Sequence, residues 1–335
     1  MRLVDKDGEI YRSGTWTNEN VWVQLNSTVI GAGIKNYQWS EDGGTTWKTT
    51  SLTTANNLGT ITFTADINKE ICFRAVDNNN VESDISRETI RKDSVAPTVS
   101  VTRNDYKTFK WTASDTSSGI AGYIITTTDT TPTGFTLGST ESGSKTVTSA
   151  GTYYVWVKDS AGNIGKKSIT AYTMKRSQGT GSTLTTRVGS TSASTGTEVT
   201  ANTVVLSGTT IWAKATANTG YNTPVLKNGT VTMTATGATA TITANTTISS
   251  SATINTVTIS YDFNGGNNMN AWKYRNGTRF TNKYDTSTGL TDVSVAGASG
   301  WEIVYIPIAT TVGKKYTMSF DYQIPKAYTA LSGYS

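Results

Sequence analysis

Apolar and polar residues alternate over many short stretches of this chain. Val21, Val23 and Leu25 alternate with Trp22, Gln24 and Asn26, and the same period recurs at 211–215 and 238–242. A period of two places every second side chain on one face of a β-strand, so each stretch predicts a strand with one buried face. The pattern predicts an all-β protein built from short, two-faced strands.

Turn residues separate these strands. Between two of them lies Asp42-Gly43-Gly44, which predicts a tight hairpin because glycine accepts positive φ at little cost. One larger arrangement of two landmarks occurs twice: Gly33 is followed later in the chain by a strand at 71–76 that runs into Asp77, and Gly119 by a strand at 153–158 that runs into Asp159. Each landmark recurs after roughly 80 residues, which predicts a linear array of small β-domains with thin cores.

Composition narrows the chemistry. The 335 residues include no histidine and one cysteine, Cys72. Without histidine the chain cannot build a Ser-His-Asp site, a Cys-His site or a histidine-ligated zinc site. Two carboxylates such as Asp285 and Glu302 would suffice for a glycosidase, but the acidic residues fall at turns and strand edges. We therefore predict that the chain is not an enzyme.

Charge and hydropathy exclude two further classes of partner. The net charge is +5, and the basic residues are spread along the chain without the aromatic interleaving of a nucleic-acid stripe. No run approaches the about 18 apolar residues of a membrane span. We predict neither nucleic-acid binding nor membrane insertion in this segment.

The run from Arg91 to Val99 contains Asp93-Ser94-Val95-Ala96-Pro97-Thr98 and resembles the joint between tandem immunoglobulin-like repeats of Gram-positive surface proteins. The hairpin at 37–47 and the turn at 157–163 are typical of the same repeats, and the likeness covers residues 14–174. It implies two immunoglobulin-like domains, at 14–94 and 95–174. We expect residues 1–13 to end a preceding unit or linker.

In the second domain the order Gly151-x-Tyr153-x-Val155 places Val155 where antibody domains carry their second disulfide cysteine. The resemblance implies that Tyr153 makes the corner hydrogen bond of such sandwiches. A valine in place of cysteine implies a core held by packing alone.

The C-terminal half resembles two other modules. We expect a flexible polar linker at 175–182 and a small Thr/Ala-rich unit at 183–256, where 209–221 resembles internalin-B-type repeats. That likeness implies a β-grasp-like spacer, and a further sandwich is the alternative. Residues 257–335 resemble the first part of a jelly-roll carbohydrate-binding module, and the rest of that fold would come from further chain or from a partner.

Candidate binding residues follow from this last resemblance. Flat aromatic faces stack on sugar rings, and the candidates are Trp272, Tyr274, Trp301 and Tyr305; the alternative is that they form a sandwich core. The Asp-rich turns at Asp159 and Asp262 are candidates for calcium, which prefers oxygen ligands. We predict no other cofactor.

Together these patterns predict a non-catalytic extracellular adhesin or stalk that displays a carbohydrate-binding β-sandwich on a Gram-positive cell surface. Its partners would be cell-surface or extracellular glycans, with other copies of itself in a fibre or virion as a further option. Two alternatives stay open: a phage tail or capsid protein that attaches to host or mucosal glycans, and accessory modules of a secreted polysaccharide-degrading enzyme.

Overall fold

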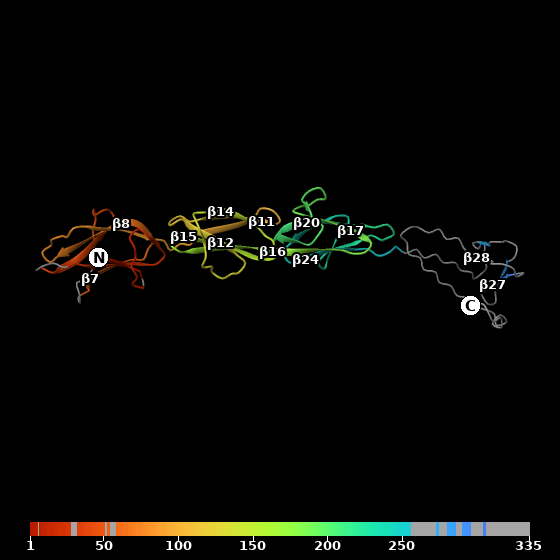
Figure 1. Ribbon diagram of the computed structural model, residues 1–335, viewed down its shortest axis with the longest axis horizontal. Helices are drawn as coiled ribbons and strands as arrows, with labels where there is room; N and C mark the ends of the chain where they lie inside the picture. The colour runs from red at the N-terminus through yellow and green to blue at the C-terminus, as the bar shows by residue number, and fades with distance from the viewer. Residues whose placement is uncertain are drawn as a thin grey trace.

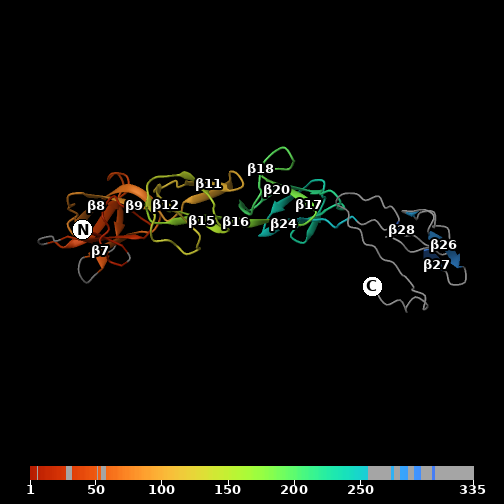
Figure 2. The same cartoon turned by 45° about the vertical axis from the view of Figure 1, so that its right-hand side comes forward.

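The computed structural model describes residues 1–5, 7–27, 32–50, 52–53 and 58–255, with the strand segments 273–274, 280–285, 290–295 and 304–305. Every regular element in these residues is a β-strand. Three β-units, β1 to β9, β10 to β16 and β16 to β24, follow one another along the long axis (Figure 1), and Figure 2 shows the same order from a second direction. The predicted linear array of small β-sandwiches is confirmed. Among the described residues, no helix is long and apolar enough to cross a membrane.

The first unit is a sandwich of two sheets with orders β1-β3-β7-β6 and β2-β9-β8-β4-β5. Both sheets contribute side chains to one buried cluster, the first core, for example Val23 from β3 and Phe73 from β8. The strands are β1 (Arg2–Val4), β2 (Trp16–Thr17), β3 (Val21–Asn26), β4 (Ile34–Ser40), β5 (Lys48–Thr50), β6 (Leu52–Thr53), β7 (Leu58–Phe63), β8 (Ile67–Asp77) and β9 (Ser86–Lys92).

The N-terminal segment belongs to this first unit. We expected residues 1–13 to end a preceding unit, but β1 pairs with β3, and Leu3 and Tyr11 lie in the first core. The Tyr11 hydroxyl donates to the carbonyl of Thr15 (2.6 Å) and accepts from the N–H of Arg91 on β9 (2.9 Å). These bonds and the buried ring tie the segment to both sheets, a tertiary effect that local sequence does not display.

The second unit has a sheet of order β10-β11-β14 facing the strands β13-β12-β15-β16 of a larger sheet. Trp111 of β11 and Val155 of β15 meet in the second core, and both are almost completely buried. The strands are β10 (Thr98–Arg103), β11 (Thr108–Ser114), β12 (Ile120–Thr126), β13 (Thr136–Leu137), β14 (Ser142–Thr146), β15 (Gly151–Asp159) and β16 (Ile164–Gln178). The Tyr153 hydroxyl donates to the carbonyl of Ser149 (2.9 Å), so the predicted corner bond is confirmed.

The sequence repeat corresponds to a repeated turn. The carbonyl of Gly33 accepts from the N–H of Asn78 (3.1 Å), and the carbonyl of Gly119 accepts from the N–H of Ser160 (3.0 Å). Both glycines have positive φ, 73° and 74°, which a residue with a Cβ rarely adopts. The two landmarks of the repeat are therefore the two sides of one contact between neighbouring strands.

The third unit is also built from strands alone within its described residues, which fits the sandwich alternative. Its own sheet has the order β18-β17-β20-β23, and its second layer is formed by β16, β24, β21 and β22 of the larger sheet, with β19 pairing β16. Ile211, Ala213 and Ala215 of β20 lie in the third core, as their alternation predicts. The strands are β17 (Ser182–Val188), β18 (Thr197–Glu198), β19 (Thr203–Leu206), β20 (Thr209–Ala217), β21 (Val225–Asn228), β22 (Val231–Met233), β23 (Ala238–Ile242) and β24 (Thr246–Ser251).

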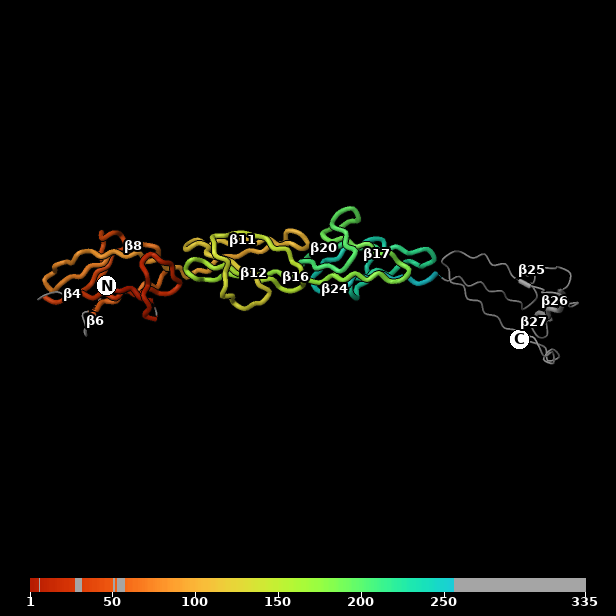
Figure 3. Tube along the Cα trace, viewed as in Figure 1, coloured from red at the N-terminus to blue at the C-terminus, as the bar shows by residue number. Residues whose placement is uncertain are grey.

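The second and third units share β16. This strand of 15 residues pairs with β15 through its first part and with β24 through its last part, and Figure 3 follows it from one unit into the next. Ala171 lies in the second core and Met174 in the third. Their spacing of three places them on opposite faces of the strand, so the two units pack on opposite faces of one sheet.

The linker that we expected at 175–182 is therefore mostly strand, since β16 ends at Gln178 and β17 begins at Ser182. Its polar side chains do not prevent pairing, because ladder hydrogen bonds join backbone groups. The N–H of Arg176 also donates a hydrogen bond to Oδ1 of Asn202 (2.9 Å).

Four short strands are described in the C-terminal part. They form two antiparallel pairs: β25 (Lys273–Tyr274) with β28 (Val304–Tyr305), and β26 (Phe280–Asp285) with β27 (Leu290–Val295). The predicted jelly roll at 257–335 otherwise lies outside the described residues.

Candidate functional site

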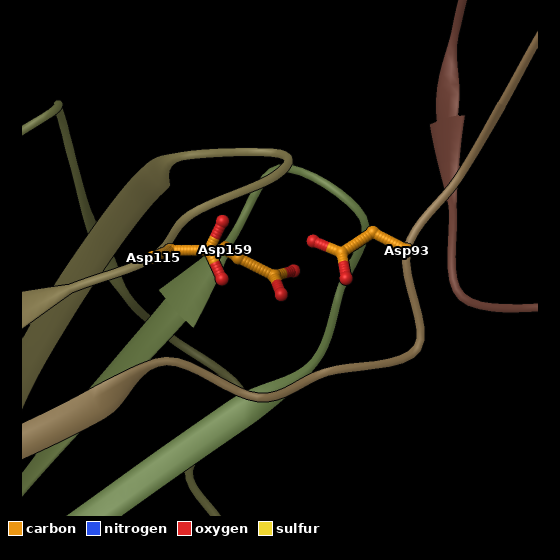
Figure 4. Close-up of side chains that lie close together, drawn as sticks. All are labelled: Asp93, Asp115 and Asp159. Carbon is orange, nitrogen blue, oxygen red and sulfur yellow. The ribbon is translucent and has the colours of Figure 1, made fainter. Parts of the chain in front are cut away.

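Three carboxylates meet at the joint between the first two units. Asp93 follows β9, Asp115 follows β11 and Asp159 ends β15, and one carboxylate oxygen of each lies within 4.8 Å of the others. Figure 4 shows these side chains arriving from three separate segments. The topology brings them together because β15 returns to the end of the second unit at which the chain enters from the first.

Asp93 is 0% exposed and connects the joint to the second unit. Its Oδ1 accepts from the N–H of Val95 (3.0 Å), and its Oδ2 accepts from the N–H of Ser118 (3.1 Å). Asp115 holds the same loop, since its Oδ1 accepts from the N–H of Ser117 (3.1 Å) and of Gly119 (2.7 Å). Backbone donors thus fix the orientation of both carboxylates.

Asp159 is 1% exposed and is held by its own turn. Its Oδ1 accepts from the N–H groups of Gly162 (2.7 Å) and Asn163 (2.8 Å), and its Oδ2 accepts from Nδ2 of Asn163 (2.8 Å). The same Nδ2 donates to the carbonyls of Asp93 (2.8 Å) and Val95 (3.3 Å). Asn163 therefore links the turn of the second unit to the segment that arrives from the first.

The cluster concentrates negative charge at a place where Asp93 and Asp159 are buried and Asp115 is half-buried. Within the described part of the chain, no lysine or arginine forms an ion pair with any of the three carboxylates. Burial, and then the negative charge of Asp93, raises the pKa of Asp159 above its ordinary value, against the hydrogen bonds from Asn163 and Gly162. Charged Asp159 and Asp93 are therefore costly to keep together without a proton or a cation.

The donor set suits a hard cation. Carboxylate and carbonyl oxygens are the ligands that Ca²⁺ takes in proteins. The Ser118 hydroxyl oxygen, beside Asp93 through the backbone bond above, is buried and has no hydrogen-bond partner among the described residues. The cluster contains the Asp159 that the sequence nominated for calcium, together with Asp93 and Asp115, which it did not nominate.

Two of the four predicted sugar-binding residues lie among the described residues, and two do not. Trp272 and Trp301 lie outside the described residues, as does the second calcium candidate, Asp262. Tyr274 and Tyr305 lie on the paired strands β25 and β28, in the registers Tyr274 with Val304 and Lys273 with Tyr305. Their backbones are thus neighbours across one ladder.

Two shallow cavities flank the joint between the second and third units. One, of about 370 Å³, is lined by residues that include Lys107, Thr173 and Asn202, and the other, of about 350 Å³, by residues that include Arg103 and Asp105. Neither lining contains two carboxylates, the minimum for the acid pair of a glycosidase.

Comparisons with known proteins give little to set beside this geometry. No protein-family model matches the sequence, and no curated protein matches it. Among solved structures, the fibronectin(III)-like modules of Clostridium thermocellum CbhA are similar to part of the chain. They have 15% identity and a TM-score of 0.28 over 50% of this chain and 92% of that one.

Sequence reasoning missed two members of the cluster, and signals for both were present. Asp93 opens the joint motif, and Asp115 lies four residues before the landmark Gly119. Neither signal is specific, because aspartate is common in turns. Only the arrangement of three strand ends around one joint selects these two residues.

Proposed function

We propose that this chain is a non-catalytic stalk of an extracellular protein, which holds a carbohydrate-binding C-terminal domain away from a Gram-positive cell surface. The observation that carries the stalk proposal is β16, a single strand that belongs to two units. A shared strand allows no hinge between its two halves without breaking ladder hydrogen bonds. The second and third units therefore act as one stiff body.

The first joint supports the same proposal in a different way. Asp93 and Asn163 connect the first unit to the second through backbone and side-chain hydrogen bonds. Pro97 follows within a few residues and restricts the backbone of the connecting segment. A short connection with these bonds keeps the units in line.

The glycan-binding part of the proposal rests on the aromatic residues Trp272, Tyr274, Trp301 and Tyr305. A single aromatic stack contributes about 0.5–1.5 kcal/mol beyond burial, so one site would bind weakly. Many copies on one surface would raise the avidity. A phage tail or capsid protein would use the same construction, and accessory modules of a polysaccharide-degrading enzyme would need it only as a spacer.

Small-angle X-ray scattering of the full chain tests the stalk. A compact protein of this length would have a radius of gyration of about 20 Å, and a stalk must exceed that value clearly. A radius near the compact value would refute the proposal.

A glycan array tests the second part. We expect binding by the full chain that falls when Trp272 and Trp301 are each replaced by alanine. Binding that persists in both variants, or no binding to any glycan, would reject these residues as a sugar site.

The calcium prediction for Asp159 is part of this proposal, with Asp93 and Asp115 as the other ligands. Bound Ca²⁺ would neutralise the cluster and fasten the first joint. We expect the melting temperature of the wild type to be higher in CaCl2 than in EGTA, because a ligand at 100 times its Kd stabilises by about 2.7 kcal/mol. Asp115→Ala, which removes both carboxylate oxygens, should reduce this difference, and equal melting temperatures of the wild type in the two solutions would exclude the ion.

A further inference from the structure

Two neighbouring parallel strands carry the chain into and out of the third unit. β16 brings it in from the second unit, and β24 is the last strand before the chain leaves. The two pair in parallel from Met174 with Thr246 to Gln178 with Ser250. Tension along the stalk would pull β16 backward and β24 forward, so that the two strands would have to slide past each other.

This geometry loads the whole ladder at once. Hydrogen bonds of a parallel ladder are evenly spaced, and five register pairs share the load. If the strands were instead pulled apart from one end, the bonds would open one after another. Breaking several bonds together needs a higher barrier, and forced unfolding is governed by the rate of crossing that barrier.

Further bonds close the ladder at both ends. Before it, the N–H of Thr173 donates to Oδ1 of Asn245 (2.8 Å), and after it the N–H of Gly179 donates to the carbonyl of Ser250 (2.6 Å). The hydroxyls of Ser182 and Ser250 form a buried hydrogen bond of 2.9 Å. Sliding the strands by one register would break all three contacts.

The third core resists the same movement. Met174 of β16 and Ile248 of β24 are both fully buried in it. Translation of one strand by a residue would also turn these side chains to the opposite face, because side chains alternate along a strand. Core packing and backbone pairing therefore oppose the same displacement.

The other units offer less resistance of this kind within their described residues. In the first unit, β2 and β9 are parallel over only two register pairs, Trp16 with Arg91 and Thr17 with Lys92. In the second unit, the entering strand β10 and the leaving strand β16 lie in different sheets. The five-pair ladder is thus particular to the third unit.

We propose that the β16–β24 ladder is a mechanical clamp, which keeps the third unit folded when the stalk is under tension. The proposal deepens the stalk function, on which its biological setting rests. The mechanics rest on the pairing and packing of β16 and β24 and hold for any pull along these two strands.

Single-molecule force spectroscopy on the full chain tests the clamp by changing only the direction of pull. The shear variant carries handles on Lys175→Cys and Ser251→Cys, and the matched unzipping variant carries them on Gln178→Cys and Ser251→Cys. All three positions are exposed, and the native Cys72 is fully buried, so it stays out of reach of the handles. Complete unfolding should lengthen the chain by at most roughly 270 Å in the first variant and 260 Å in the second.

The clamp predicts that the shear variant unfolds at a force higher by a factor of about two or more at the same loading rate. Equal forces in the two directions would overturn it. Both variants must melt at the wild-type temperature without load; if the Ser251 handle disturbs folding, a handle on the exposed Ile254 replaces it in both. A compact scattering profile would reject the stalk but leave this comparison of forces unaffected, so the two failures are distinguishable.

Discussion

The close contact between Pro97 and Gly165 of β16 allows a test of how tightly the second unit is packed. Gly165 lies on β16 opposite Val157, next to the segment that begins the unit. A Cβ added at Gly165 would fall on the carbonyl oxygen of Pro97, and would lie 3.1 Å from the carbonyl carbon and 3.3 Å from Cγ2 of Val99. The backbone of Gly165 does not require glycine, because its φ is not in the left-handed region. Gly165→Ala therefore perturbs only the close approach.

The expected magnitude follows from two opposing effects. A backbone carbonyl cannot rotate away as a side chain can, so β10 or β16 must shift, and overpacking of this kind costs about 1–3 kcal/mol. Replacing glycine by alanine also restricts the unfolded chain, which stabilises by about 0.4–1 kcal/mol. The net loss should be about 1–2 kcal/mol, concentrated in the second unit.

Hydrogen exchange measured by mass spectrometry reads this loss unit by unit, which a single melting curve of a multidomain chain does not. Peptides from β10 and β16 should exchange faster by a factor of about 5–30. Gly134→Ala is the matched control in the same unit, because its Cβ would meet no atom within 4 Å and its φ is also outside the left-handed region. If the amides of the two variants exchange at the same rate, the carbonyl of Pro97 does not lie as close to Gly165 as in the structure.

Three further predictions concern single contacts. Tyr153→Phe should destabilise the second unit by about 1 kcal/mol, because the bond to Ser149 is lost and the ring is kept; unchanged exchange of β15 amides would contradict this. Met174→Ala should cost about 2–5 kcal/mol and increase exchange on both sides of the shared sheet, whereas a loss confined to one unit would argue against sharing. In melting curves measured at a series of pH values without calcium, the melting temperature of Asp159→Asn should rise relative to that of the wild type as the pH rises above 3.8. Because the pKa of Asp159 is raised in the folded state, the stability that its protonation contributes to the wild type is lost as the pH rises through that folded-state pKa. A difference in melting temperature between the two proteins that does not change with pH would count against the raised pKa.

Local pattern was sufficient to predict the parts of this fold that local residues determine. Alternation identified the strands, and the hairpin glycines Gly43 and Gly44 have the positive φ that the turn requires, 75° and 98°. Asp42 adds to that turn: hydrogen bonds from the hydroxyls of Ser40 and Thr46 hold its pKa well below the usual range. Each of these features involves residues that are close in sequence.

The parts that could not be predicted depend on pairing between distant segments. The polar residues 175–178 read as linker because linkers are polar, yet the ladder with β24 gives their backbone partners some seventy residues away. Asp159 could be nominated from its turn, but Asp93 and Asp115 join it only through the topology. A local sequence pattern indicates the structural preference of each side chain, whereas these features depend on which distant segments the fold brings together.

The two joints of the array differ in the forces that hold them, and this difference has mechanical consequences. At the first joint, the contacts converge on the buried carboxylates of Asp93 and Asp159, so its strength depends on the protonation of Asp159 and on any bound cation. At the second joint, β16 continues as backbone ladder, and neutral N–H and carbonyl groups provide the strength. Acid or a chelator can therefore act on the first joint while the second is unaffected. In the proposed stalk, any bending would occur at the joint between the first two units, and tension would be carried through the third unit.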